Sequence, residues 1–285
     1  HKAFELLDFL TGSGMRRADL LVALGGGVVG DLAGFVASVY KRGVPVLQVP
    51  TTLMAQVDSS IGGKTGVNLP RGKNLVGTFH QPVAVICDVD TLETLPEREY
   101  RSGLAEVAKY SFLRPELWPV PLAESADLLK ELDKEELATV VNRCAGIKAR
   151  IVSADEYDTG VRAVLNYGHT LGHALEAATG YETYTHGEAV SVGMVFAAHV
   201  ATEVGITDGG LVDRHLEVLA SLGLPVAPYP PAPEFERVLD AVWQDKKSRG
   251  GLTMVLLAGE GNAMVRHDLD TAVLAECYQR LMGGA

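Results

Sequence analysis

A glycine-rich turn between an apolar run and a helical segment constrains the fold of this chain more than any other feature. The run Asp19–Leu24 leads into Gly25-Gly26-Gly27, Gly30 follows, and Asp31–Tyr40 has the spacing of a helix. Glycines at a strand-to-helix turn let backbone N–H groups and a helix N-terminus approach a phosphate. The acidic residue expected about 20 residues after a standard dinucleotide-binding loop is absent around Pro50. A turn that needs glycine only for steric reasons therefore stays open.

Two further apolar runs extend this pattern. Val44–Val49 and Pro82–Val89 are typical of buried strands, and helical segments between such runs indicate a parallel sheet. We expect an incomplete α/β nucleotide-binding domain over residues 1–94. The first residue is histidine and His1–Leu10 already has the pattern of a helix interior, so we expect the chain to begin part-way into that domain.

After about residue 95 the spacing of apolar residues becomes mostly helical. We expect a mostly α-helical, metal-binding domain over residues 95–285. Its predicted helices are Glu97–Leu113, Lys134–Ala154, Gly168–Thr179, Gly187–Val204, Gly209–Leu222 and Pro233–Asp245, followed by a hairpin of Leu252–Leu257 with Ala263–Arg266 and a last helix from Asp270.

Composition narrows the class of protein. Among 285 residues, 47% are hydrophobic and 21% charged, which is typical of a globular chain. A net charge of −11 argues against nucleic-acid or anionic-membrane binding, and there is no apolar run of membrane-spanning length. The three cysteines, Cys87, Cys144 and Cys277, are widely spaced and form no CxxC pair, so we expect neither disulfides nor a cysteine metal site, and a cytoplasmic setting.

Cations gather in one glycine-rich stretch of this acidic chain. Between Asp58 and His80 lie Lys64, Arg71 and Lys73, and Lys109, Lys148, Arg162 and Lys246-Lys247 are further candidates for binding phosphate or carboxylate. Each of them could instead be a solvated surface cation. Gly63-Lys64-Thr65 resembles the end of a P-loop, but Asp58 stands where that motif needs glycine, which excludes an ATPase of this kind.

The sequence also contains a possible metal site. His169 and His173 are four residues apart, on one face of a helix, and Thr170 stands where a metalloprotease motif requires glutamate. His186 opens the next predicted helix, and Glu106 lies among apolar neighbours. One carboxylate with two imidazoles is a common catalytic zinc set. Spacing alone does not decide which of His169 and His173 binds metal, and a packed histidine pair remains the alternative.

Taken together, these residues resemble the 3-dehydroquinate synthases of the sugar-phosphate cyclase superfamily along almost the whole chain. The matching blocks are GGGVVGDLAGFVAS (25–38), RGVPVLQVPTTLMAQVDSSIGGKTGVN (42–68), GKNLVGTFHQP (72–82), TLETLPEREYRSGLAEVAKY (91–110), VSADEYDTGVRAVLNYGHTLGHALE (152–176), HGEAVSVGM (186–194) and DKK (245–247).

The resemblance implies a set of site residues. Glu106, His169 and His186 would hold zinc, with cobalt as the alternative metal, and His173 would contact substrate and transfer protons. Asp158 stands where the family usually has glutamate, so its charge is kept on a shorter side chain. Arg42 would reach the site of a neighbouring subunit, which implies a homodimer. The implied substrate residues are Arg42, Asp58, Lys64, Asn74, Lys109, Lys148, Arg162, Asn166, His173 and Lys246, and the implied catalytic residues are His173, Asp158, Lys109 and Asp58.

The resemblance also implies NAD as a cofactor. The positions that match the family's NAD contacts are Lys2, Gly26, Gly27, Val28, Asp31, Thr51, Thr52, Lys73, Thr91, Leu92, Glu93 and Thr94. Everything that the family has before Lys2 is absent from this sequence, including the acidic residue expected to hold the adenosine ribose.

The family reaction is a phosphate-eliminating cyclisation, catalysed by a carbon–oxygen lyase. It converts 3-deoxy-D-arabino-heptulosonate 7-phosphate to 3-dehydroquinate, in the shikimate pathway of aromatic amino acid biosynthesis. Three alternatives remain: a sister cyclase acting on a sedoheptulose or hexose phosphate, a metal-dependent polyol dehydrogenase, and a chain that binds zinc without turning over. Lys148, Arg162, Asn166 and Lys246 are all present, which favours the dehydroquinate reaction over that of a sister cyclase.

Overall fold

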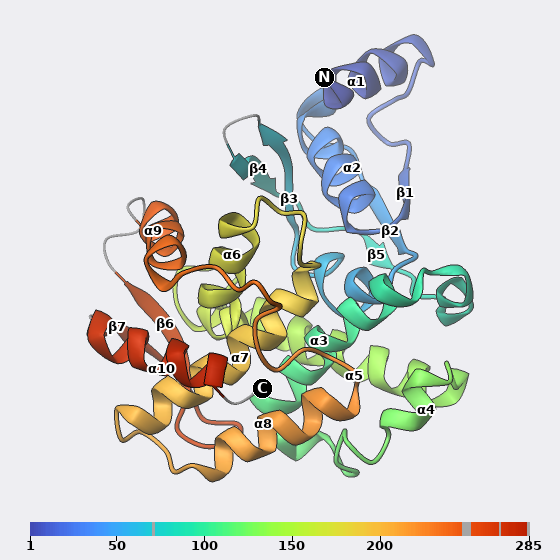
Figure 1. Cartoon of the computed structure of the whole chain (residues 1–285). Coiled ribbons are helices and arrows are strands. Elements are labelled where there is room, and N and C mark those ends of the chain that lie inside the picture. Colours follow the sequence, from blue (N-terminus) through green and yellow to red (C-terminus); the bar gives the residue numbers. More distant parts are fainter. Residues whose placement is uncertain (70–71, 247–251, 268, 284–285) are drawn as a thin grey trace. The chain divides into compact units, whose positions relative to one another are not determined.

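The computed structural model describes residues 1–69, 72–246, 252–267 and 269–283 (Figure 1). It contains two compact units. The first unit comprises His1–Pro96 and Leu137–Tyr157, and the second comprises Glu97–Glu136 and Asp158–Ala285. The segment Leu137–Tyr157 thus groups with the first unit, whereas the sequence prediction divides the chain once, between residues 94 and 95. As a division into functional domains, that boundary stays a prediction. Among the described residues, no helix is both long and apolar enough to cross a membrane.

The first unit combines a small parallel sheet, a hairpin and several helices. Its elements are α1 (Lys2–Gly12), β1 (Leu21–Gly25), α2 (Gly27–Val39), the short helix η1 (Tyr40–Arg42), β2 (Val46–Pro50), the π-helical turn η2 (Ala55–Ser59), β3 (Lys64–Leu69), β4 (Gly72–Phe79), β5 (Ala84–Val85), the 3₁₀ helix η3 (Val89–Thr94) and most of α5 (Lys134–Ala154).

Three strands of this unit pair in the order β1-β2-β5, and both pairings are parallel. β1 and β2 run in register from Leu21↔Val46 to Gly25↔Pro50, so the two strands end side by side. Because the two strands are parallel, the loop after β1 and the residues after β2 lie at the same end of the sheet, and α2 connects the strands. The predicted parallel sheet is confirmed.

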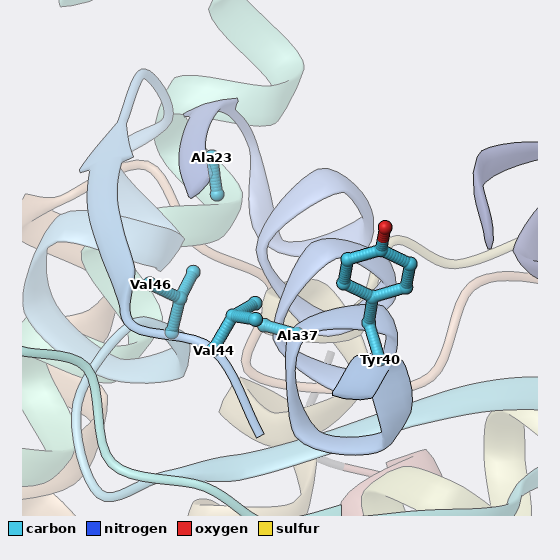
Figure 2. Packing of buried hydrophobic residues seen from close by; sticks show 5 residues of the cluster. All are labelled: Ala23, Ala37, Tyr40, Val44 and Val46. Atoms are coloured by element: carbon cyan, nitrogen blue, oxygen red, sulfur yellow. The ribbon is translucent and has the colours of Figure 1, made fainter. Parts of the chain in front are cut away.

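A compact apolar cluster attaches α2 to this sheet (Figure 2). Partly buried Leu7 and Leu10 of α1 pack against it, which attaches the first helix to the same core. Burying a large apolar side chain contributes roughly 1.5–3 kcal/mol, so even a small cluster fixes how α2 lies on the strands. The buried members are Ala23, Ala37, Tyr40, Val44 and Val46.

The glycine-rich cationic stretch forms an antiparallel hairpin, which the sequence analysis did not identify. β3 and β4 pair from Lys64↔Phe79 through Val67↔Val76, with an irregularity between Val67 and Leu69. The Thr65 and Thr78 hydroxyl groups lie 2.9 Å apart, and the Thr78 hydroxyl donates to Ser38 on α2. Alternating glycines and polar residues hid the strand pattern because the hairpin has little apolar side chain to bury.

The second unit is built from helices and one hairpin. Its elements are α3 (Glu97–Leu113), η4 (Pro115–Leu117), α4 (Ala126–Lys130), η5 (Val161–Asn166), α6 (His169–Ala178), α7 (His186–Glu203), α8 (Gly210–Ser221), α9 (Phe235–Lys246), the strands β6 (Thr253–Leu257) and β7 (Ala263–His267), and α10 (Thr271–Gly283).

Most predicted elements agree with the structure to within two residues, and α3 and α5 have the predicted bounds. Two differ more. α2 begins at Gly27, four residues before the predicted start at Asp31, because Gly26 is the N-cap and the following glycines enter the helix. β5 contains only Ala84–Val85 of the run Pro82–Val89, since just these two residues pair with β2.

Small residues let three helices of the second unit cross closely. A Cβ atom at Gly187 of α7 would overlap with the backbone of Ser102 on α3, and a Cβ at Gly193 would overlap with the carbonyl of Gly168 before α6. Gly172 of α6 faces Ala189 of α7, with its added Cβ 3.2 Å from the Ala189 carbonyl. These contacts are between backbones, so no side-chain movement can relieve them.

A buried polar pair lies beside this helix crossing. The Tyr167 hydroxyl lies 2.9 Å from Nε2 of His215, and His215 Nδ1 lies 2.7 Å from the carbonyl of Leu211. Since a carbonyl only accepts, Nδ1 carries the proton and Nε2 accepts from the tyrosine. His215 also stacks on Phe112, with ring centroids 3.8 Å apart. Burial lowers the pKa of His215 to about 4, so the imidazole is neutral near pH 7.

We expect Gly187→Ala to destabilise the second unit by about 2 kcal/mol or more, because overpacking against backbone cannot relax. Gly146→Ala is the matched control, since Gly146 lies in α5 with nothing within 4 Å of an added Cβ. That control should be neutral or slightly stabilising. Urea unfolding followed by circular dichroism measures both variants. Equal stability of Gly187→Ala and the parent would contradict the close crossing.

His215 predicts a pH dependence of stability. Its folded pKa lies below the unfolded value of about 6.5, so the unfolded chain binds the proton first as the pH falls, and the free energy of unfolding decreases between about pH 6.5 and pH 4. This group should lower that free energy by about 2 kcal/mol between pH 7.5 and pH 5. His215→Gln should show a smaller decrease in urea titrations at these two pH values. A decrease as large as in the parent would assign the pH dependence to other groups.

Candidate functional site

Three helices of the second unit bring a carboxylate and three imidazoles together. Glu106 lies in the middle of α3, His169 is the first residue of α6, and His186 is the first residue of α7. Glu106 Oε1 lies 3.5 Å from His169 Nε2 and 3.8 Å from His186 Nε2. His173 joins them one turn along α6, and a ligand atom of each of the three histidines lies within 4.8 Å of the others.

The ends of these helices are fixed by specific contacts. Arg98, in the first turn of α3, donates to both carboxylate oxygens of Glu188, at 2.9 and 2.7 Å. The Glu188 carboxylate also accepts from the Thr185 backbone N–H, and the Thr185 hydroxyl accepts from the Glu188 backbone N–H, which forms a capping box at the start of α7. His186 therefore begins a helix whose first turn is bonded to the helix that carries Glu106.

Glu106 is the most unusual group of the cluster because its carboxylate is fully buried. Its Oε2 is paired with the ammonium of Lys109, whereas its Oε1 has no hydrogen-bond donor among the described residues. A buried carboxylate oxygen without a donor is costly unless a cation contacts it. With two imidazole nitrogens close by, this donor set fits a divalent transition metal such as zinc.

The outer nitrogens of two imidazoles are already engaged. His169 Nδ1 donates to the Tyr167 carbonyl at 3.0 Å, and His186 Nδ1 donates to Glu176 Oε2 at 3.2 Å. In both rings this leaves Nε2 directed towards Glu106. The sequence analysis missed both acceptors. Glu176 could have been found as a carboxylate seven residues after His169, on the same face of α6.

The two imidazoles differ electrostatically. Burial lowers the pKa of His169 well below its usual value, and the nearby charges of Lys109 and of the other two imidazoles add to this decrease. Burial also disfavours the charged form of His186, but the hydrogen bond to Glu176 and the charge of Glu106 outweigh it and raise the pKa. A neutral imidazole is the form that binds a metal, so His169 is ready to act as a ligand near pH 7.

His173 differs from its neighbours because its side chain is exposed. Its ring centroid lies 5.3 Å from that of His169 and 5.7 Å from that of His186. An exposed imidazole beside two partly buried ones can exchange protons with a bound molecule and with solvent. The geometry thus brings all four residues of the predicted metal region together, and the division of roles among the histidines stays a prediction.

In the first unit, four of the predicted NAD residues lie just after the ends of the parallel strands. Gly26 and Gly27 follow β1, and Thr51 and Thr52 follow β2. A Cβ at Gly26 would lie 2.9 Å from the Thr52 methyl group, and one at Gly27 would lie 2.9 Å from the Ser59 hydroxyl. The N-terminus of α2 is therefore lined by backbone and hydroxyl groups, a cradle that fits a phosphate.

The remaining NAD predictions fall into three groups. Thr91, Leu92, Glu93 and Thr94 form part of η3, which Gln56 ties to η2 by donating to the Asp88 carbonyl at 2.8 Å and to the Thr91 hydroxyl at 3.2 Å. Val28 and Asp31 lie in the first turns of α2. Lys2 lies in the first turn of α1, where it pairs with Glu5, and the Lys73 side chain is outside the described residues.

Asp31 and two predicted substrate residues form a charged group. Lys148 on α5 pairs with the Asp58 carboxylate at 3.0 Å and donates to the Asp58 carbonyl at 2.8 Å. Burial raises the pKa of Asp31 to about 6; the charge of Lys148 opposes this rise and that of Asp58 adds to it. The three residues come from α2, η2 and α5, so this part of the first unit depends on the segment Leu137–Tyr157.

The other predicted substrate residues divide between the two units. In the first unit, Lys64 begins β3 and exposed Arg42 has a left-handed backbone, with φ 64°. In the second, Lys109 and Arg162 are buried cations. Asn166 ends η5, and Asp158 is left-handed, with φ 57°. The side chains of Asn74 and Lys246 lie outside the described residues, as do Arg71 and Lys247.

The second unit thus combines a donor set that fits a divalent metal with a buried cation, Lys109, next to it. Lys109 lies one helical turn after Glu106 and pairs with it. Such a site can bind a divalent metal and an anionic, oxygen-rich molecule together. In the described part of the chain the three cysteines form no disulfide, and none of them belongs to the cluster.

Comparison with known proteins shows the family of this chain. Family models for the 3-dehydroquinate synthase N-terminal and C-terminal regions match residues 1–102 and 103–248. A 3-dehydroquinate synthase from Pelobacter propionicus is 50% identical over 245 residues, which are 86% of this chain and 68% of that protein.

Solved structures show the same fold. The 2-epi-5-epi-valiolone synthase ValA from Streptomyces hygroscopicus, solved with NAD+ and Zn2+, has a TM-score of 0.90 at 29% identity, covering 100% of this chain and 79% of ValA. A 2-deoxy-scyllo-inosose synthase solved with carbaglucose-6-phosphate, NAD+ and Co2+ has a TM-score of 0.88 at 29% identity, covering 98% and 78%. The α/β nucleotide-binding fold is thereby confirmed, and the chain belongs to the 3-dehydroquinate synthase family.

Proposed function

We propose that this chain is an enzyme that cyclises 3-deoxy-D-arabino-heptulosonate 7-phosphate to 3-dehydroquinate and releases phosphate, using NAD and a divalent metal. The carrying observation is the cluster of the buried Glu106 carboxylate with the partly buried imidazoles of His169 and His186, beside the ammonium of Lys109. About half of the residues are identical to those of a protein named for this reaction, which supports the same chemistry here. The reaction would belong to the shikimate pathway and take place in the cytoplasm.

Glu106, His169 and His186 would hold zinc, with cobalt as the alternative, and the turn at Gly26 and Gly27 would hold the phosphates of NAD. When bound, the metal polarises substrate oxygens and NAD accepts and returns a hydride, so there is no net redox change. The support for the metal set is the buried Glu106 oxygen without a donor, and for NAD it is the backbone-lined start of α2.

The buried cations would bind the anionic groups of the substrate. Arg162 is almost fully buried and presents a planar guanidinium that suits a carboxylate or phosphate. Lys109 and Lys148 are buried ammonium groups paired with Glu106 and Asp58. Charges held in a site with little water stabilise a developing phosphate anion more strongly than exposed charges would. Lys64, Asn74, Asn166 and Lys246 complete the proposed substrate set.

His173 would act as a proton relay, and Asp158 would assist it. The exposed imidazole of His173 stands beside the proposed ligand His169, where it can take a proton from a substrate hydroxyl and pass it to solvent. The departing phosphate can itself collect a proton, so His173 need not be a strong base. Arg42, exposed and left-handed, is proposed to reach the site of a second subunit in a homodimer.

The full chain, supplied with the heptulosonate phosphate, NAD and zinc, should release phosphate and form dehydroquinate without lasting NADH absorbance. A zinc chelator should abolish phosphate release, and added zinc should restore it, because the Glu106 cluster depends on the metal. Lasting NADH with a polyol would favour a dehydrogenase, and turnover of only sedoheptulose 7-phosphate would favour a sister cyclase. No phosphate release at saturating NAD would contradict the proposal.

His173→Ala should reduce kcat by about 100-fold, a typical contribution of a general acid or base, while bound zinc stays at the parent level. Metal analysis and phosphate release are measured on the same protein sample. His267→Ala, on strand β7 and outside the metal cluster, serves as the histidine control. Loss of zinc from His173→Ala would make this residue a ligand, and an unchanged kcat would reject the relay role.

A further inference from the structure

The contact between His186 and Glu176 has no place in the proposed reaction. Glu176 Oε2 lies 3.2 Å from His186 Nδ1, and the Glu176 side chain is only 9% exposed. The pair joins the end of α6 to the start of α7, ten residues further along the chain. A buried carboxylate is costly in itself, so its position calls for a partner that benefits from its charge.

Glu176 is also unfavourably placed in its own helix. It lies in the last turn of α6, which ends at Ala178, where the partial negative charge of the helix C-terminus repels a carboxylate. The backbone there is firmly held, since the Glu176 carbonyl accepts from the Tyr181 N–H at 2.7 Å and from the Thr179 hydroxyl at 3.3 Å. Helix formation gains nothing from an acidic residue here, whereas His186 gains an acceptor.

The two proposed histidine ligands are held by acceptors of different charge. His169 Nδ1 donates to a neutral backbone carbonyl, and His186 Nδ1 donates to a carboxylate. A carboxylate acceptor fixes the tautomer with Nε2 free and makes that nitrogen a better electron donor to a metal. It also adds a second negative charge near Glu106, which favours a dication over a neutral occupant.

We propose that Glu176 is a positioning residue that holds His186 as a metal ligand and sets the affinity of the site for zinc. This rests on the proposed metal set of Glu106, His169 and His186. Glu176 itself lies behind the imidazole and does not bind the metal. Its carboxylate keeps Nδ1 protonated, orients the ring so that Nε2 faces Glu106 Oε1, and strengthens the bond that Nε2 forms.

Two substitutions separate the effect of the Glu176 charge from that of its side-chain length. Glu176→Gln keeps the size and an oxygen that can accept from Nδ1, but it removes the charge. Glu176→Asp keeps the charge but shortens the side chain by one methylene, which pulls the oxygen away from Nδ1. Glu182→Gln is the matched control, because Glu182 is an exposed carboxylate in the short connection between α6 and α7.

Zinc affinity, measured by competition with a chromogenic chelator, tests the proposal without requiring turnover. Glu176→Gln should bind zinc about 10- to 100-fold more weakly than the parent, the usual effect of losing such an acceptor, and Glu182→Gln should match the parent. Glu176→Asp should also be weaker. The visible absorption of the cobalt-loaded protein should change in both Glu176 variants, because the imidazole is held differently.

Thermal unfolding with and without zinc distinguishes positioning from a structural role. A positioning role predicts that the increase in Tm on adding zinc is smaller in both Glu176 variants than in the parent. Parent-like zinc affinity in both variants would overturn the proposal, even if their metal-free stability fell. A parent that binds zinc but releases no phosphate would leave this proposal standing and reject the proposed function, whereas a parent that binds no zinc would reject both.

Discussion

The close crossing of α3, α6 and α7 is the constraint on which the site depends. Gly187 and Gly193 allow the backbones of these helices to touch, and a side chain at either position would overlap with backbone of the neighbouring segment. Only at this separation can short side chains from three helices meet, as Glu106, His169 and His186 do. Interhelical packing thus contributes to chemistry as well as stability, because a shift of about 1 Å would separate ligands whose bonds to zinc are roughly 2 Å long.

The second consequence of this packing is an interior that holds several buried charges. Glu106, Lys109, Arg162 and Glu176 are all buried, in a chain whose overall charge is strongly negative. Burial makes each charge costly alone, so each must act on a neighbour or on a bound molecule. The pair of Lys109 with Glu106 and the hydrogen bond that His186 donates to Glu176 show the first kind of compensation. A bound dication and an anionic sugar phosphate would be the bound molecules that provide the second kind of compensation.

Much of the fold and of the candidate site was predictable from the sequence, for physical reasons that differ between elements. α3 and α5 were predicted to the residue because long helices repeat their apolar spacing many times. The start of α2 was misplaced because glycines carry no helical signal, and the β3–β4 hairpin was missed because it buries little apolar surface. Glu106, His169 and His186 were found from residue type and family resemblance. Glu176 was not, because spacing along α6 places it on the same face as His169 but does not show its contact with His186 on α7.

The central claim is that Glu106, His169 and His186 together bind one divalent metal. The most direct test is a crystal structure of the zinc-loaded protein with anomalous diffraction recorded at the zinc absorption edge. We predict one strong peak bonded by a Glu106 carboxylate oxygen and by Nε2 of His169 and of His186, at about 2.0–2.2 Å. A peak bonded by the three imidazoles of His169, His173 and His186 without Glu106, or a peak away from this cluster, would contradict it.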